Sequence, residues 1–251
     1  MRYLWLCLFV VSGTCRAQEQ SDLLLPWVSR NSQFESLVFV NNPTDIPAEM
    51  TLRAVRANGE AGTFSTTINP RGSLKAFVRD LFPDMGEGSG MAIRVTSSTR
   101  DLIAGWVTNN LDAPSGRSPS QGLAVPVNLS PSDEIGQALM IGHLPTTNGF
   151  TAAPVIVNIS ENPADVTLYF FNNNGDLLLA DRTTLTGLEP FRPFATVVTQ
   201  LLPDVTEDVV LIAYTETGTL AGCGFVFNSD LEPAIANARS VGFNPPDATQ
   251  K

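Results

Sequence analysis

The sequence predicts an all-β protein built from two tandem antiparallel β-sandwich domains. Three observations predict this fold: short segments in which polar and apolar residues alternate, turn residues spaced regularly between those segments, and an internal repeat. No stretch of useful length shows the period of an amphipathic helix.

Residues 1–17 are typical of a secretory signal peptide. A short positive start precedes an unbroken apolar run at 4–11, and Ala17 ends a small-residue segment suited to cleavage. The run is too short to cross a bilayer, which takes about 20 apolar residues. Lipid anchoring at Cys15 is the less favoured alternative, because the residues before it do not fit a lipoprotein signal. We therefore expect a secreted or extracytoplasmic protein (periplasm or cell surface) with no transmembrane segment in the mature chain.

The charge and cysteine content narrow the classes of partner and fold. The formal net charge is −10, and removing residues 1–17 makes the chain still more acidic. Nucleic acid is excluded as a partner, since that binding depends on neutralising phosphates with Lys and Arg. Cys223 is the only cysteine left after the signal peptide, so an intramolecular disulfide is excluded and stability must come from apolar cores.

An internal repeat defines the domains. Shifting the chain by 116 residues, with a small later insertion, brings matching residues into the same order. The matches include Phe34 with Phe150, Asn42 with Asn158, Asn58-Gly59 with Asn174-Gly175, and Pro70 with Pro190. The boundaries we expect are a signal peptide at 1–17, sandwich domain 1 at 21–127, a linker at 128–134, sandwich domain 2 at 135–242 and a flexible tail at 243–251.

Each copy is expected to contain seven or eight short strands. Residues 49–54 and 165–168 alternate polar and apolar, and each segment leads to an Asn-Gly pair that suits a tight hairpin turn. The later expected strands are 62–68, 74–78, 91–96 and 102–107 in domain 1, and 181–186, 194–198, 209–215 and 219–227 in domain 2.

Several of these motifs resemble a known kind of repeat. They are Leu24-Leu25-Pro26-Trp27-Val28, Phe34 followed by 37–43 and 47–52, Asn58-Gly59, 80–83 and 102–105. Together they resemble tandem immunoglobulin-like or fibronectin-like β-sandwich repeats of uncharacterised secreted bacterial proteins. The resemblance implies export and an immunoglobulin-like fold but no activity. Domain 2 departs from the pattern at 158–161, where the Asn-Pro turn is lost.

Candidate catalytic and metal-binding residues are few. His143 is the only histidine and falls opposite the apolar Trp27, so we interpret it as structural. Cys223, aligned with Trp106, fits a small packing residue. Residues 172–176 are similar to a calcium loop but lack a downstream glutamate ligand, so we expect a hairpin turn.

Two acidic loops follow the same corner in the two copies. Asp84 and Glu87 occupy the first loop, and Asp204 and Glu207 occupy the second. Repetition in both copies argues against a single active site, and we expect solvated loops with a weak calcium site as the alternative. We therefore predict no catalytic residue, no cofactor and no resident metal, and we expect a protein that is not an enzyme.

One difference between the copies predicts an interaction surface. Domain 1 carries Arg53, Val55, Arg94 and Thr96 where domain 2 carries Tyr169, Phe171, Leu211 and Ala213, all at positions expected to face outward. Exposed apolar patches mark interaction sites. This surface is therefore expected to be covered either by the chain itself or by a protein partner or second copy.

The sequence favours a non-enzymatic exported structural or interaction module of a cell-surface or extracellular assembly. A carbohydrate-binding protein of the cell envelope is the alternative, because sandwiches often carry such sites. A sugar site would use exposed aromatic side chains, and the chain has three Tyr and three Trp, of which Tyr3 and Trp5 lie in the signal peptide.

Overall fold

The computed structural model describes residues 20–113, 118–128, 132–178 and 183–246. The predicted signal peptide and residues 247–251 of the predicted tail lie outside the described residues. The described part consists of antiparallel strands and two four-residue helices, α1 (Val78–Leu81) and α2 (Val198–Leu201), so the all-β prediction is confirmed. No helix in this part of the chain is long and apolar enough to cross a membrane.

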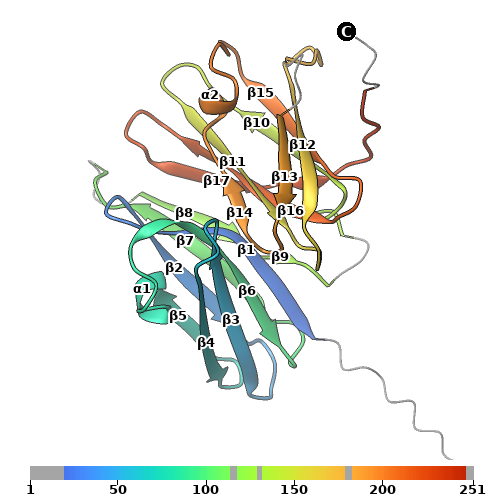
Figure 1. The fold of residues 1–251 in the computed structure, drawn as a ribbon. Helices are drawn as coiled ribbons and strands as arrows, with labels where there is room; N and C mark the ends of the chain where they lie inside the picture. Colours follow the sequence, from blue (N-terminus) through green and yellow to red (C-terminus); the bar gives the residue numbers. More distant parts are fainter. Residues whose placement is uncertain (1–19, 114–117, 129–131, 179–182, 247–251) are drawn as a thin grey trace, which may run out of the picture.

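The first half of the chain folds into two antiparallel layers around one apolar core (Figure 1). Its strands are β1 (Ser21–Arg30), β2 (Phe34–Asn41), β3 (Ala48–Arg56), β4 (Ala61–Ile68), β5 (Ser73–Phe77), β6 (Gly88–Ser97), β7 (Ile103–Asn110), β8 (Ser118–Leu123) and β9 (Val125–Pro126). One layer has the order β4-β3-β6-β1-β9 and the other β5-β2-β7-β8, and the Arg30–Glu35 pair joins them. Val38, Leu52 and Trp106, from both layers, are fully buried between them.

Alternation along β3 explains how this core is made. Met50, Leu52 and Ala54 point into the core, whereas Arg53 is exposed on the outer face. The strand ends at Arg56, and Asn58-Gly59 lies in the turn that follows, where Gly59 has a φ of 88° and its amide donates a hydrogen bond to the Arg56 carbonyl at 3.0 Å. A positive φ is easy for glycine, so the pair reverses the chain into β4.

The second half repeats this arrangement. Its strands are β10 (Ala138–Leu144), β11 (Thr151–Asn158), β12 (Ala164–Phe171), β13 (Thr183–Leu188), β14 (Pro193–Ala195), β15 (Val209–Tyr214), β16 (Leu220–Phe227), β17 (Pro233–Asn237) and β18 (Arg239–Ser240). The five-stranded sheet has the order β13-β12-β15-β10-β18 and the four-stranded sheet the order β14-β11-β16-β17. Leu139, Ile156 and Leu168 are fully buried in its core.

The two halves therefore share one strand order, which differs from the immunoglobulin order. In an immunoglobulin constant domain the first strand lies in the sheet of the second, and the seventh lies in the sheet of the third and sixth. Here β1 pairs with β6, in the sheet of β3, and β7 pairs with β2. The first and seventh strands have thus exchanged sheets, and the same exchange occurs in the second half.

Candidate interaction surfaces

The two domains pack against each other through one outer face each. Domain 1, the first half of the chain, uses its five-stranded sheet (β4-β3-β6-β1-β9), and domain 2, the second half, uses its four-stranded sheet (β14-β11-β16-β17). Leu24, Ala92 and Val125 form one side of this contact, and each is at most 1% exposed. The residues opposite them are Val155, Val157, Ala221, Cys223 and Phe225, which are also buried. Outward-facing residues are thus apolar here because a second domain covers them.

Polar groups and an aromatic ring complete this contact around Arg94. Its guanidinium donates to both carboxylate oxygens of Asp22, at 2.8 and 2.6 Å, and lies 4.6 Å from the centre of the Phe191 ring of domain 2. The hydrogen bond to Asp22 raises the pKa of Arg94. This cation–π contact joins the two domains in addition to the apolar contact.

Part of the predicted interaction surface is wrong, because the alignment of Arg94 with Leu211 and of Thr96 with Ala213 is one residue out of register in β15. Leu211 and Ala213 are 0% exposed and belong to the core of domain 2. Cross-strand pairing gives the true correspondence: Leu24 pairs with Arg94 in domain 1, and Met140 pairs with Ile212 in domain 2. Ile212 therefore corresponds to Arg94, and a slip of one residue turns every side chain to the opposite face.

The same slip affects β16. Gly105 pairs with Phe39, and Cys223 pairs with Val155, the residue 116 positions after Phe39. Cys223 therefore corresponds to Gly105 and not to Trp106. As predicted, it is a buried packing residue, but it lies in the contact between the domains.

The outer face of domain 2's five-stranded sheet is nevertheless apolar. Tyr169 and Phe171 do point outward, as predicted, because they alternate with the core residues Leu168 and Phe170. The residues that join them on β15 are Val210, Ile212 and Tyr214, all half-buried. Sequence reasoning missed these three because residues 209–214 form a continuous apolar run, in which alternation gives no sign of the inward face.

The C-terminal segment covers this face. The Phe243 ring lies 5.0 Å from the Tyr169 ring, 5.9 Å from the Tyr214 ring and 6.4 Å from the Phe171 ring, measured between centroids. Tyr169 is consequently only 3% exposed. Residues 243–246, predicted as flexible tail, therefore belong in part to the packed structure of domain 2, and the chain itself supplies a cover for the predicted surface.

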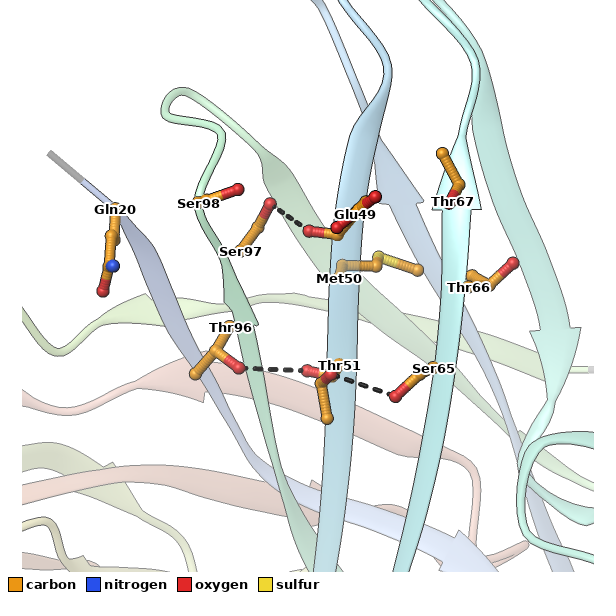
Figure 2. Close-up of a pocket in the computed structure, with 10 residues that line it drawn as sticks. All are labelled: Gln20, Glu49, Met50, Thr51, Ser65, Thr66, Thr67, Thr96, Ser97 and Ser98. Atoms are coloured by element: carbon orange, nitrogen blue, oxygen red, sulfur yellow. Dashed lines mark hydrogen bonds between the residues drawn. The ribbon is translucent and has the colours of Figure 1, made fainter. Parts of the chain in front are cut away.

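Each domain also has an open polar groove at the same place on its five-stranded sheet. In domain 1 the groove has a volume of about 540 Å³, and Figure 2 shows Thr51, Ser65 and Thr96 side by side on three neighbouring strands. The Thr51 and Ser65 hydroxyl groups are hydrogen bonded at 3.0 Å. In domain 2 the corresponding groove, of about 480 Å³, is lined by Thr167, Thr184 and Tyr214, together with Asp165, Tyr169 and Pro245.

An apolar cavity of about 210 Å³ lies between the domains. Its wall includes four aromatic side chains, Trp27 and Phe34 of domain 1 and Phe225 and Phe227 of domain 2. The Phe34 and Phe227 rings are 5.6 Å apart, so aromatic contacts continue the interface at the edge of the cavity.

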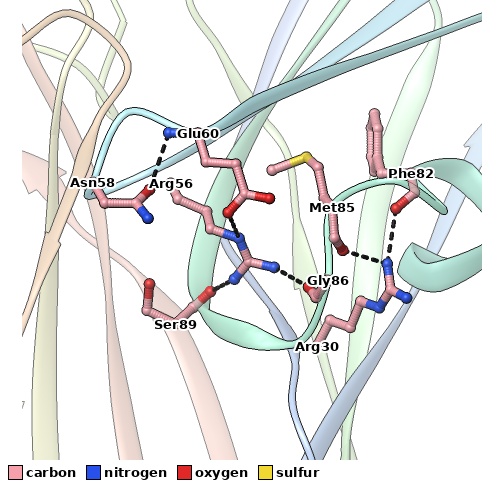
Figure 3. Close-up of polar contacts among 8 residues, drawn as sticks. All are labelled: Arg30, Arg56, Asn58, Glu60, Phe82, Met85, Gly86 and Ser89. Atoms are coloured by element: carbon pink, nitrogen blue, oxygen red, sulfur yellow. Dashed lines mark hydrogen bonds and ion pairs between the residues drawn. The ribbon is translucent and has the colours of Figure 1, made fainter.

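Two arginines hold the first acidic loop. Arg30 donates hydrogen bonds to the Phe82 carbonyl at 2.8 Å and to the Met85 carbonyl, while Arg56 donates to the Gly86 and Ser89 carbonyls and pairs with Glu60 (Figure 3). Carbonyl oxygens that could bind calcium thus already accept from cations. Asp84 and Glu87 are exposed on this loop.

The second acidic loop is held differently, because domain 2 has Thr146 and Asn172 at the positions of these arginines. The Asp208 carboxylate accepts hydrogen bonds from the Thr146 amide and the Thr147 hydroxyl, both at 3.2 Å. Asp204 and Glu207 are exposed. Among the described residues, no group of three or more His, Cys, Asp or Glu side chains is placed to hold a metal ion.

The two remaining candidates have no role in a site that the structure shows. His143 is exposed at β10. At the turn that is similar to a calcium loop, the Asn172 side-chain oxygen accepts from the Asn174 and Asp176 amides at 2.9 Å each, and Gly175 has a φ of 86°. Residues 172–176 therefore form a turn closed by the chain's own amides.

Comparison with known proteins identifies no family. No protein-family model matches the chain, and no curated protein matches it. Among solved structures, the crystal structure of the PBSX exported protein XepA is similar over 84% of this chain and 81% of that chain, at 11% identity and a TM-score of 0.25. A likeness at that level carries no argument about fold or function.

Proposed function

We propose that this chain is a non-catalytic interaction module of an exported assembly, in which two sandwich domains act as one rigid unit. The observation that carries the proposal is the apolar contact between the domains. Leu24, Val125, Val157 and Cys223 are each 0% exposed there. A contact that excludes water in this way opposes the independent motion expected of domains joined only by a linker.

A surface for another component is available on the free side of this unit. The outer face of the four-stranded sheet of domain 1 carries Ile103, 52% exposed, and Leu123, 53% exposed. Phe39, on the adjacent strand β2, lies over Gly105 of β7, where a Cβ atom would come within 2.5 Å of its ring. This face corresponds to the one that domain 2 uses to contact domain 1, so it has the character of a docking surface.

Site-specific cross-linking in the source cells tests this function. A photoreactive amino acid at position 103 or 123 is expected to give covalent adducts of defined mass in the extracytoplasmic fraction. Thr63, exposed on the outer face of β4, is the matched control and is expected to give none. Absence of adducts at 103 and 123, or equal labelling at 63, would refute the proposed function.

Carbohydrate binding is the second candidate, and the paired grooves favour it. Hydroxyl groups and one carboxylate occur at equivalent positions in both, with Glu49 in domain 1 and Asp165 in domain 2, and the second groove adds Tyr214. Hydroxyl and carboxylate groups hydrogen bond sugar hydroxyls, and a tyrosine ring can pack on a sugar face. Calorimetry with isolated envelope polysaccharides tests it: heat of binding that Tyr214→Ala removes is expected, and no heat with any polysaccharide would exclude it.

A further inference from the structure

The two outer faces left free by the domain contact are copies of the two faces that form it. Within the chain, the outer face of domain 1's five-stranded sheet docks on the outer face of domain 2's four-stranded sheet. The unused counterparts are the Tyr169–Ile212–Tyr214 face of domain 2 and the Phe39–Ile103 face of domain 1. We call them the C-face and the N-face. A second copy of this chain would therefore present a ready N-face to the C-face of the first.

Residue pairs across the existing contact show which groups would meet. Leu24 and Ala92 correspond to Met140 and Val210 on the C-face, and all four are apolar. Val155, Ala221 and Phe225 correspond to Phe39, Ile103 and Val107 on the N-face, which are likewise apolar. Val125 and Val157 of the contact correspond to the polar residues Arg239 and Asn41. The free faces thus keep most, but not all, of the apolar residues of the contact already present in the chain.

The cation–π contact at the edge of the interface also has a counterpart on the free faces, in which the arginine stands at the position of the aromatic residue and aromatic residues surround the position of the arginine. In the chain, Arg94 lies under Phe191, which has a φ of 59° in its turn. The residue of domain 1 that corresponds to Phe191 is Arg71, which has a φ of 56° in the equivalent turn. The residue that corresponds to Arg94 is Ile212, and on the sheet it is surrounded by Tyr169, Phe171 and Tyr214.

Docking of a second copy would thus place an arginine over three aromatic rings. Arg71 is 76% exposed in the single chain, where its partner is the equally exposed Asp45 at 2.6 Å. An exposed ion pair of this kind contributes little to stability, so Arg71 can exchange it for an aromatic contact at small cost. In both contacts domain 1 supplies the arginine and domain 2 the aromatic rings, but the arginine lies on the five-stranded layer in one contact and at the edge of the four-stranded layer in the other.

In the single chain Phe243 takes the place of that arginine. Its ring contacts the three aromatic side chains around Ile212, as Phe191 covers Arg94 in domain 1. Phe243 covers the C-face with a single ring, so a whole domain face, which would bury more apolar surface, can displace it. Phe243 therefore acts as a cap on the C-face.

We propose that the C-face of domain 2 binds the N-face of domain 1 of a second copy of this chain, with Phe243 as the intramolecular cap that limits this association. The proposal rests on the proposed function and names the partner. Because the two faces differ, the contact is head-to-tail, and such contacts give rings or open filaments rather than simple two-fold dimers.

Analytical ultracentrifugation of the purified mature chain over a range of concentrations tests the proposal. Phe243→Ala is expected to raise the association constant at least about tenfold, and adding Arg71→Glu is expected to cancel that increase. Arg53→Glu is the matched control for charge reversal, since Arg53 is exposed on β3 and lies in neither face. It should leave association of Phe243→Ala unchanged.

Two results would overturn the proposal. One is a Phe243→Ala chain that stays monomeric with an unchanged circular dichroism spectrum and melting temperature. The other is association that Arg71→Glu does not reduce, which would show non-specific contact of exposed apolar groups. If Phe243→Ala lowers the melting temperature, Ile103→Asp in the otherwise unchanged full chain serves instead. Ile103 is 52% exposed on the N-face, in the other domain from the cap, so its substitution is expected to abolish the association seen at high concentration, and association that persists would overturn the proposal. Adducts of another protein at position 103, without self-association, would reject this inference and leave the proposed function standing.

Discussion

Replacing Leu211 and Ile212 by alanine, one at a time, tests which face of β15 lies in the core of domain 2. Leu211 is 0% exposed and packs among the core residues of domain 2, whereas Ile212 is half-buried on the outer face. Truncating a buried leucine costs about 2–5 kcal/mol, since apolar contact is lost and a cavity remains. Truncating Ile212 removes fewer buried atoms, and we expect a cost of about 1 kcal/mol.

Urea denaturation of the purified full chain measures the difference. Leu211→Ala is expected to lower the unfolding midpoint clearly with little change in the slope, and Ile212→Ala to lower it by less than half as much. The two substitutions remove side chains of the same size from adjacent positions, so each controls for the other. An equal loss from both, or a larger loss from Ile212→Ala, would show that the register derived from the Met140–Ile212 pairing is incorrect.

Three further predictions concern the thiol, the domain contact and the N-terminus. Burial raises the pKa of Cys223, so the unfolded thiol loses its proton at a lower pH than the folded one. The free energy of unfolding is therefore highest below the unfolded pKa of about 8.5, and above that pH it falls by up to about 1.4 kcal/mol per pH unit. Cys223→Ala is expected to remove this pH dependence, which denaturation curves at several pH values would measure. A thiol that reacts with a thiol reagent in the folded chain would contradict the burial. Leu24→Asp places a charge in the domain contact, so after proteolytic cleavage within 128–134 its two halves should separate on gel filtration, whereas the wild-type halves stay together. Mass spectrometry of the exported chain should find Gln18 as its first residue, and an acylated Cys15 would contradict this.

The all-β fold could be predicted from the sequence because its signals are local. Alternation along 49–54 places Met50 and Leu52 on one face whatever lies around them. Asn58-Gly59 and Asn174-Gly175 reverse the chain because glycine accepts a positive φ. The repeat identified the positions in β3 and β12 correctly, so that Arg53 and Tyr169 are both outward.

The later strands show where local signals end. Residues 209–214 are apolar throughout, and the loops before them differ in length between the copies, so only pairing with β10 and β12 decides that Leu211 faces inward and Ile212 outward. One residue of uncertainty in a loop was enough to move Leu211 and Ala213 from the core to a predicted surface.

The sequence by itself determined that this chain forms short antiparallel strands, where they turn, and that domain 2 is more apolar on one outer face. Those properties depend on residues close together along the chain. Only the tertiary structure decided what covers each face: domain 2 covers Leu24 and Val125, and Phe243 covers Tyr169. Contacts between residues so far apart depend on the packing of whole sheets, and no local pattern of polar and apolar residues encodes which sheet will meet which.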